Sequence, residues 1–410
     1  MNLFSFNTSV KAQGAGTKPI MNLYLLDQAI NIAVKDNPTL QAEIAKTGIS
    51  KSQLTTINTL SNPYFIAQQS IGQQQYSYGL ERTWQTGGGR KYSKRIAIIT
   101  NDIDLLELQK QTLEIRQQAR KAYIDHFSNQ EKLRIEQEIY SVGRKIVDDD
   151  IKTKKFSNPN IFLAEEVLLS IANDIQTLKV EIIKSKTNLE EITGKNLDKE
   201  ITLLAPKEIP LALKNIMGQE LSSKSDEKIE KLTQMAMEKR PLELEANKNI
   251  ELWENERKLA LADRFPIVIL AAGAVLDFNA KLYGPFINAN IELPIFELHK
   301  DRIQQADSQL DYYKKQKTSV ENQITYQVKG AYNTLVANKE RINNYETQLL
   351  PKAEEIRKGS LNSYKKGATT VDNPLSAQRT YIDTKIAYLQ AVADYQESIT
   401  VMERVLGVGL

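Results

Sequence analysis

The sequence predicts a mainly α-helical chain with a small β part, in which two copies of long antiparallel coiled-coil helices each carry one pair of β-strands. Three observations lead to this fold class. Similar segments recur in one order in both halves, long stretches carry almost no helix breaker, and two short stretches have the strand period of two.

The duplication rests on pairs of similar segments whose offset grows slowly along the chain. Pro38 and Pro241 begin comparable segments 203 residues apart, and Pro63 and Pro266 keep that distance. A steady order with a growing offset is what small insertions leave behind after a duplication. The remaining pairs are Ala122-Tyr123 with Ala331-Tyr332, 209 residues apart, and Leu189–Gly194 with Met402–Gly407, 213 residues apart.

The first copy, residues 21–194, is predicted to contain four helices and a strand hairpin. Pro38 marks a helix start, because the missing N–H of a proline would be unpaired in the first turn anyway. A very long helix is expected where the chain has no proline and a single glycine, Gly143. Helices are expected at Leu25–Lys35, Pro38–Leu60 and Ser93–Lys155, followed by a final helix that ends at Gly194. The hairpin is expected at 62–85, between the second and the long helix, with its turn near Gly72–Tyr78.

The second copy, residues 228–407, is predicted to repeat this order. Residues 195–227 contain two prolines and a glycine and are expected to connect the copies. Residues 1–20 are either the remnant of a signal peptide or a disordered tail. Its helices are expected at Lys228–Arg240, Pro241–Asp263 and Asp301–Gly367, followed by a final helix that ends at Gly407. Its hairpin is expected at 265–296, with the turn near Asp277–Gly284.

The long helices indicate a bundle rather than a globule. A helix of about 60 residues spans roughly 90 Å. In each copy the second and the final helix together match that length, so we expect them to stack end to end along the long helix. A heptad seam in the final helix favours packing of the coiled-coil type. The residues of this seam are Tyr381, Tyr388, Val392, Tyr395, Ile399, Met402 and Leu406.

The second strand pair has the pattern of a membrane-barrel wall. The stretch Phe265–Leu276 is too short to cross a bilayer as a helix but long enough to cross it as a tilted strand. Four strands cannot close a barrel, so two chains would give eight strands and three would give twelve. In the partner strand, the apolar residues Ile287, Ala289, Ile291 and Leu293 alternate with the polar residues Asn288, Asn290 and Glu292. The alternative is a pair of soluble hairpins, which the glutamine-rich stretch from Gln68 to Gln75 favours.

The composition argues against an enzyme. There is no cysteine and there are only two histidines, which leaves almost nothing for a thiolate, a zinc site or a Ser-His-Asp arrangement. His126 extends an apolar stripe and is predicted to be a packed or interface residue, and His299 has no carboxylate or histidine at ligand spacing. We therefore predict no catalytic, cofactor-binding or metal-binding residues. The net charge of +3 gives no case for a nucleic-acid partner.

From Leu25 to Gly407 the chain resembles the TolC family of outer-membrane efflux channels. The motifs that carry the resemblance are Asn37-Pro38-Thr39-Leu40, Leu293-Pro294-Ile295-Phe296, Leu349-Leu350-Pro351, Tyr364–Thr370 with Leu375–Arg379, and Glu403–Gly407. The resemblance implies a trimer whose strands form one twelve-stranded barrel in the outer membrane above a periplasmic α-barrel. It also implies partners, namely a periplasmic adaptor and an inner-membrane pump of the resistance-nodulation-division type. The turn Gln85–Lys91 is similar to the glycine-glycine-basic turn of the heavy-metal efflux branch, or it is simply a flexible turn.

In a channel of this kind the working parts would be a constriction and a docking surface. The turns at the far ends of the long helices are expected to form the periplasmic tip and gate. Asp372 is the acidic residue nearest to the place where the family often carries an acidic ring, although a helix N-terminus also favours an aspartate. The predicted tip residues are Ser157, Asn158, Pro159, Gly367, Thr370, Asp372, Asn373 and Ser376.

Two hypotheses about function follow. The first is a passive export conduit, which is favoured by the alternating strand and the duplicated order. The second is a soluble periplasmic coiled-coil scaffold or adaptor without a membrane barrel, which is favoured by the glutamine-rich first hairpin. The residues do not separate metal cations, drugs and secreted proteins as substrates of a conduit.

Overall fold

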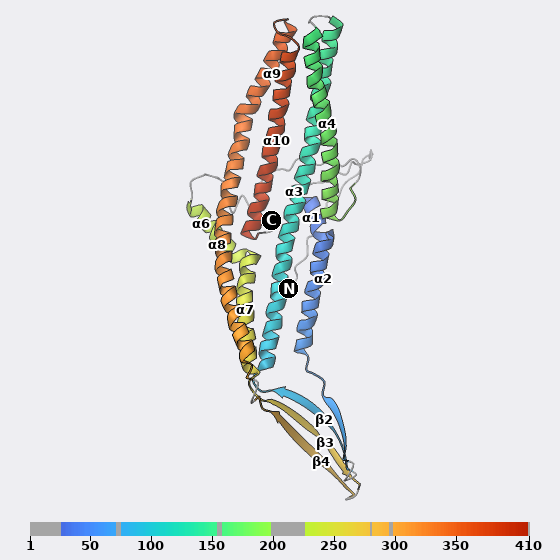
Figure 1. The fold of residues 1–410 in the computed structure, drawn as a ribbon, viewed down its shortest axis with the longest axis vertical. Coiled ribbons are helices and arrows are strands. Elements are labelled where there is room, and N and C mark those ends of the chain that lie inside the picture. Colours follow the sequence, from blue (N-terminus) through green and yellow to red (C-terminus); the bar gives the residue numbers. More distant parts are fainter. Residues whose placement is uncertain are drawn as a thin grey trace, which may run out of the picture.

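The molecule is elongated, with a bundle of long helices at one end and a single β-sheet at the other (Figure 1). The computed structural model describes residues 26–70, 75–153, 158–197, 226–278, 281–294 and 298–408. Its helices are α1 (Leu26–Asp36), α2 (Pro38–Asn58), α3 (Gly89–Thr153), α4 (Asn158–Thr193), α6 (Asp226–Lys239), α7 (Pro241–Ala262), α8 (Lys300–Asn344), the π-helical turn η1 (Tyr345–Leu349), α9 (Leu350–Lys365) and α10 (Asp372–Leu406). Its strands are β1 (Tyr64–Ser70), β2 (Gln75–Gln85), β3 (Ile267–Asp277) and β4 (Leu282–Glu292).

The predicted fold class is confirmed, and short helices do run along the long ones. Helices α2 and α4 both lie against α3, while α7 lies against α8 and α10 lies against α8 and α9 (Figure 1). The long helix of the first half begins at Gly89 rather than at the predicted Ser93, since the glycine turn itself opens the helix: the Lys91 N–H donates to the Gly88 carbonyl at 2.9 Å.

The end-to-end contact of α2 with α4 is fixed by a cap. The Asn37 side chain accepts a hydrogen bond from the Leu40 N–H at 3.1 Å, and its amide donates to the Ile192 carbonyl at 2.8 Å. Gly194 ends the helix with φ +65°, and a Cβ there would lie 2.8 Å from the Asp36 carbonyl oxygen. One asparagine and one glycine therefore hold the two helix ends together.

The contact between α10 and α7 is built in the same way. Gly407 ends α10 with φ +69°, and a Cβ there would lie 2.6 Å from the Cα of Arg240, which precedes Pro241 at the start of α7. Both contacts thus join a helix that ends at a left-handed glycine to one that begins with a proline.

The second long helix is continuous but irregular. The Leu350 N–H donates to the carbonyl of Tyr345, five residues back, which makes η1 a π-helical turn. Pro351 follows directly and has no N–H to continue the ladder. The π-turn therefore lies next to the position where the helix loses a hydrogen bond.

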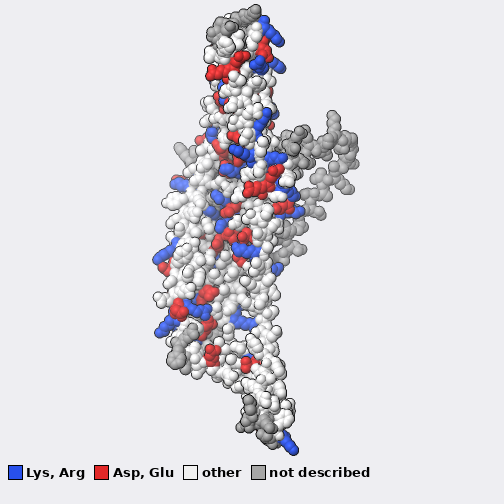
Figure 2. Space-filling model, turned by 45° about the vertical axis from the view of Figure 1, so that its right-hand side comes forward, with Lys and Arg blue, Asp and Glu red and all other residues white. Residues whose placement is uncertain are grey.

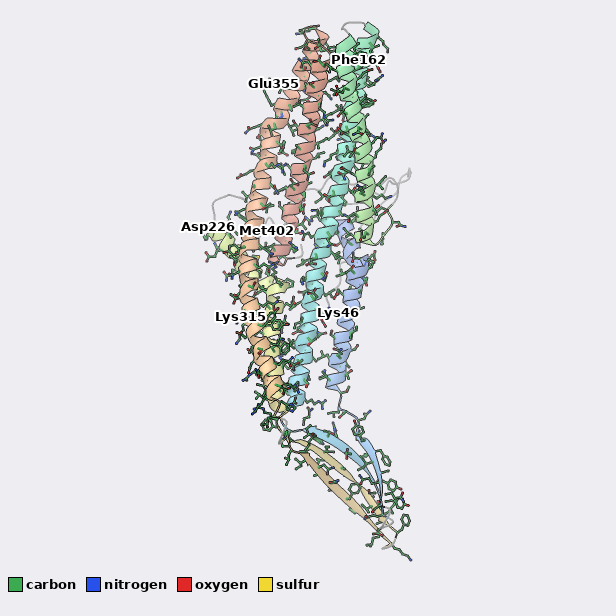
Figure 3. All side chains as sticks on the ribbon, viewed as in Figure 1. Lys46, Phe162, Asp226, Lys315, Glu355 and Met402 are labelled. Carbon is green, nitrogen blue, oxygen red and sulfur yellow. The ribbon has the colours of Figure 1, made fainter. Side chains whose placement is uncertain are left out.

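The core runs along the helices in separate clusters. The largest cluster joins α6, α8 and α10, and the seam residues Ile399, Met402 and Leu406 are buried in it, as predicted. Met402 lies where α10 faces α8 (Figure 3). The buried ion pair of Arg120 with Glu403, at 3.3 Å, links α3 to the same part of α10.

The sheet is antiparallel, in the order β1-β2-β3-β4. Two predicted turns were too long, because β2 already begins at Gln75 and β4 at Leu282. The prediction that Leu293 belongs to the fourth strand was wrong, since β4 ends at Glu292 and Leu293 follows it, 59% exposed. The helices in the described part of the chain include none that is long and apolar enough to span a membrane.

Candidate functional site

The sheet has two chemically different faces, which the strand register defines. All three ladders run without a bulge, so directly paired residues lie on one face and alternate residues lie on the other. Ile287 is paired with Ala272, and Ala272 with Leu80, whereas their neighbours Asn288 and Glu81 lie on the opposite face.

One face is apolar across the four strands. The predicted barrel residues Ile287, Ala289 and Ile291 lie on it, and Ile287 is 85% exposed. Figure 2 shows almost no charged group over the sheet on the side in view. The apolar face comprises Phe65, Ala67, Tyr76, Tyr78, Leu80, Trp84, Val268, Leu270, Ala272, Ala274, Leu276, Tyr283, Pro285, Ile287, Ala289 and Ile291, together with the polar residues Gln69 and Arg82.

Aromatic residues mark both ends of the apolar face. Tyr76 and Tyr78 lie near the hairpin end, and Trp84 lies near the helices, about 26 Å from Tyr76 along β2 at about 3.3 Å per residue, or about 18 Å in height for a strand tilted by about 45°. The Arg82 guanidinium lies 5.0 Å from the centre of the Trp84 ring. Aromatic girdles on both sides of an apolar band are typical of the lipid-facing side of membrane barrels.

The opposite face, which we call the polar face, is mixed: half of its residues are polar, whereas β3 is mainly apolar here too and Tyr64, Ile66, Leu282 and Phe286 add apolar side chains from β1 and β4. It carries three carboxylates, Glu81, Asp277 and Glu292, and no basic residue within the strands. Gln68 and Gln75 also lie here, so part of the glutamine-rich stretch belongs to the polar side. Its polar residues are Gln68, Ser70, Gln75, Ser77, Glu81, Thr83, Gln85, Asp277, Asn288, Asn290 and Glu292.

Phe286 covers the centre of the polar face. A Cβ on Gly79 would lie 2.9 Å from its ring, and a Cβ on Gly273 would lie 2.7 Å from it. The two glycines leave the space that the Phe286 ring occupies. The sequence analysis did not predict this position of Phe286. A glycine within each of two strands is the sequence signal for such a close approach, but it can be used only once the two glycines are known to be paired.

The sheet has two open edges. Within the described residues β1 pairs only with β2, and β4 only with β3. An exposed apolar sheet with free edges is a template for pairing with further strands.

The tip lies at the other end of the helices. Gly367 ends α9 with φ +73°, and the N–H groups of Gly367 and Ala368 donate to the carbonyls of Tyr364 and Ser363, both at 2.9 Å. These bonds form a Schellman motif, which requires a residue that tolerates positive φ.

Asn373 links the parts of this turn. Its side-chain oxygen accepts a hydrogen bond from the Ser360 hydroxyl, and its amide donates to the Thr369 hydroxyl, both at 2.9 Å. The Thr370 carbonyl accepts from the Asn373 N–H at 3.3 Å. Asp372 is the first residue of α10, and its Oδ1 is buried without a hydrogen-bond partner among the described residues.

The other predicted tip residues are less informative. Ser376 is exposed on α10. Asn158 and Pro159 begin α4, and Ser157 lies outside the described residues. Whether any of these residues forms a constriction stays a prediction.

A charge cluster that sequence reasoning missed lies between α3, α4 and α10, and in it Glu136 is buried while Arg379, Asp174 and Asp383 are partly or fully exposed. Glu136 is 2% exposed, and its Oε2 has no hydrogen-bond partner in the described structure. Burial raises the pKa of Glu136 to about 7; Arg379 opposes this shift, whereas Asp174 and Asp383 add to it. Arg379 lies 2.7 Å from Asp174 and 3.3 Å from Asp383. The sequence could not predict this cluster, because its residues come from three different helices and share no regular spacing along any one of them.

The histidines lie far apart. His126 is 2% exposed, and its Nδ1 lies 2.9 Å from the Ser185 hydroxyl, so it is a packed residue, as predicted. Burial lowers its pKa, and the charge of Lys186 adds to this. His299 has φ +46° and lines a cavity of about 410 Å³ between the helices and the sheet. The described residues contain no group of three or more His, Cys, Asp or Glu side chains placed to hold a metal ion.

Comparison with known sequences gives one partial match. No protein-family model matches the chain. The cobalt-zinc-cadmium resistance protein CzcC of Cupriavidus metallidurans is 26% identical over 148 residues, which cover 35% of this chain and about a third, 34%, of that protein.

Comparison with solved structures covers nearly the whole chain. CusC, described in connection with transmembrane channel formation, is matched over 97% of this chain and 95% of its own, with a TM-score of 0.70 and 16% identity. The open state of the MtrE outer membrane channel of Neisseria gonorrhoeae is matched over 94% of this chain and 89% of its own, with a TM-score of 0.74 and 16% identity. The chain therefore has the fold of the TolC-type outer-membrane channels, as its sequence resemblance implied.

Proposed function

We propose that the chain is the outer-membrane channel component of a tripartite efflux system. Three copies form one twelve-stranded barrel in the membrane, and their helices form a tunnel that extends into the periplasm. The channel is a passive conduit and needs no catalytic residue.

The observation that carries this proposal is the two-faced sheet with open edges. Ile287 is 85% exposed and no other described helix or strand covers the apolar face around it, whereas the opposite face carries most of the polar residues of the sheet. Only a closed barrel satisfies the edge hydrogen bonds of β1 and β4 in lipid, and four strands are too few to close one. Strands from further copies supply the missing pairs, with the apolar face toward lipid and the polar face toward water.

Heavy-metal cations are the substrates that we favour. The partial match to a cobalt-zinc-cadmium resistance protein supports this choice. The polar face also carries Glu81, Asp277 and Glu292 without a basic residue in the strands, which suits the passage of cations. The partners are an adaptor that docks at the helical tip and an inner-membrane pump of the resistance-nodulation-division type.

The first test is the mass of the chain expressed with a working export signal and extracted in detergent. A detergent-dependent particle of about 140 kDa of protein, three times 46.5 kDa, is the expected result. A monomer or dimer that stays soluble without detergent would overturn the channel and favour the soluble scaffold. The substrate is tested separately, by survival on cobalt, zinc or cadmium in a host that supplies the matching pump and adaptor.

A further inference from the structure

A basic groove lies between the first turns of α3 and the last turns of α7. Its cavity of about 430 Å³ is lined by four cationic side chains and no carboxylate. The lining residues are Lys91, Tyr92, Lys94, Arg95, Ile98, Asn255 and Lys258. We refer to Lys91, Lys94, Arg95 and Lys258 as the basic groove.

Most of this charge is not neutralised within the chain. Arg95 pairs with Glu251. Lys91, Lys94 and Lys258 are exposed and form no ion pair with any described residue, even though Glu254 precedes Lys258 by one helical turn. The groove therefore has an excess of three positive charges.

The position of Lys91 is unfavourable for its own helix. Lys91 lies in the first turn of α3, which has no acidic residue, and a cation near a helix N-terminus opposes the macrodipole. An unfavourable positive charge that no described residue neutralises is expected at a functional site, where a bound anionic ligand neutralises it.

The basic groove is separate from the cavity on the polar side of the sheet. That cavity is lined by Gln85 and Glu292 of the polar face together with Asp263, at the end of α7, and it shares no lining residue with the basic groove. Lys258 lies about 140° from Asp263 around α7, although Ala262, about 40° from Lys258, also lines the cavity. The separation of the two sites favours a basic groove on the side of Trp84 and Ile287.

The basic groove lies just beyond the helix end of the apolar face. Trp84 lies at that end, and α3 begins five residues later at Gly89. Lys91 and Lys94 lie within about 8 Å of Gly89 along the helix axis, and the turn between Trp84 and Gly89 adds to their distance from Trp84. A long lysine side chain at this height can reach back toward the polar headgroup region, which occupies about 5–8 Å on each side of the hydrocarbon core.

The groove is also accessible in the proposed trimer. α3 and α7 contact each other, while α2 flanks α3 and α8 flanks α7, so α2 and α8 form the lateral edges of this part of the chain. Neighbouring copies would meet those edges, as they meet β1 and β4 of the sheet. A second copy of the chain is therefore not the partner that covers the groove.

We propose that the basic groove binds the headgroup of an anionic phospholipid at the periplasmic surface of the outer membrane. The lipid phosphate lies among Lys91, Lys94 and Lys258, and its acyl chains follow the apolar face of the sheet. The inference rests on the proposed function, because it requires the apolar face to be in lipid.

The test uses the purified, detergent-extracted trimer and three probes: dioleoylphosphatidylglycerol, dioleoylphosphatidylcholine and inorganic phosphate. Native mass spectrometry measures the lipid that is retained during titration. A lysine near an anionic membrane surface contributes about fivefold in affinity. Replacing the three lysines together (Lys91→Gln, Lys94→Gln, Lys258→Gln) is expected to weaken phosphatidylglycerol binding at least about tenfold, whereas the corresponding arginine variant retains it.

The matched control replaces three exposed lysines that form no ion pair within the described structure and lie far from the sheet, Lys145→Gln, Lys179→Gln and Lys329→Gln. It has the same net charge as the test variant and is expected to bind phosphatidylglycerol like the wild type. Equal binding by the test variant and the wild type would overturn the lipid site, and so would competition by millimolar inorganic phosphate, which would indicate a site for the free anion. Failure to obtain a detergent-dependent trimer would instead overturn the proposed function on which the site depends.

Discussion

Ile287 offers a direct test of which face of the sheet meets lipid. It is the sixth of the eleven residues of β4, so about 17 Å of strand lies on either side of it at about 3.3 Å per residue. A strand tilted by about 45° places it about 12 Å below each membrane surface, near the midplane. A lysine at the midplane on the lipid face costs about 2–4 kcal/mol, hence about 6–12 kcal/mol for a trimer.

Ile287→Lys is therefore expected to abolish assembly into the outer membrane. The assay is the fraction of chain that forms detergent-resistant trimers in isolated outer membranes, compared with the wild type. Asn288→Lys is the matched control, because it introduces the same charge one residue away on the polar face. It is expected to assemble normally.

The two variants also separate the competing hypotheses about function. On a soluble hairpin, Ile287 would be a surface residue at 85% exposure, and its replacement would change the free energy of unfolding by no more than about 0.5 kcal/mol. Normal assembly of Ile287→Lys would refute the assignment of the apolar face to lipid. Equal defects in both variants would refute the assignment of the two faces.

Further predictions concern the helices. Gly407→Ala should destabilise the chain by more than about 1 kcal/mol, because φ is +69° and the Cβ would overlap Arg240; Gly359→Ala, with open space around it, should be neutral or stabilising, and thermal unfolding measures both. Glu136 has a folded pKa of about 7 against an ordinary 4.5, so its contribution to stability is present below pH 4.5 and is lost as the pH rises through 7. Glu136→Gln should remove this loss, of up to about 3 kcal/mol, in unfolding measured from pH 4 to 8. Asn373→Ala should accelerate amide exchange at the tip at least about fivefold, since two side-chain hydrogen bonds are lost.

Each of these predictions has a contradicting result. A tolerated Gly407→Ala would mean that the contact with α7 is not tight. A wild-type pH dependence in Glu136→Gln would assign the titration to another group. Unchanged exchange in Asn373→Ala would mean that the Schellman turn at Gly367 holds the tip without the side-chain bonds.

Much of the fold was predictable because it depends on local patterns. Proline and glycine mark helix ends through their own backbone limits, so Pro38, Pro241, Gly194 and Gly407 could be read from the sequence. The alternation around Ile287 predicted one apolar face for the same reason, since side chains alternate along any strand.

Features that depend on register or on contacts between distant segments were not predictable. The first turn was predicted to include Tyr78, because glutamines and glycines resemble a loop until the pairing with Ala274 is known. The charge cluster around Glu136 needs three helices to form. The π-turn before Pro351 cannot be read from the sequence either, because a proline within a helical pattern can also end or kink the helix.

The order of the strands has a consequence for the time course of folding. β1 and β2 form a local hairpin, and so do β3 and β4, but the central ladder joins Gln75–Gln85 to Ile267–Asp277 across 181 residues of chain. During synthesis the first hairpin is complete long before its partner exists, and it exposes an unpaired apolar edge in the meantime. The central ladder is the slow, non-local step of the sheet. A chaperone that shields the first hairpin would thus be needed most in the interval before β3 is made.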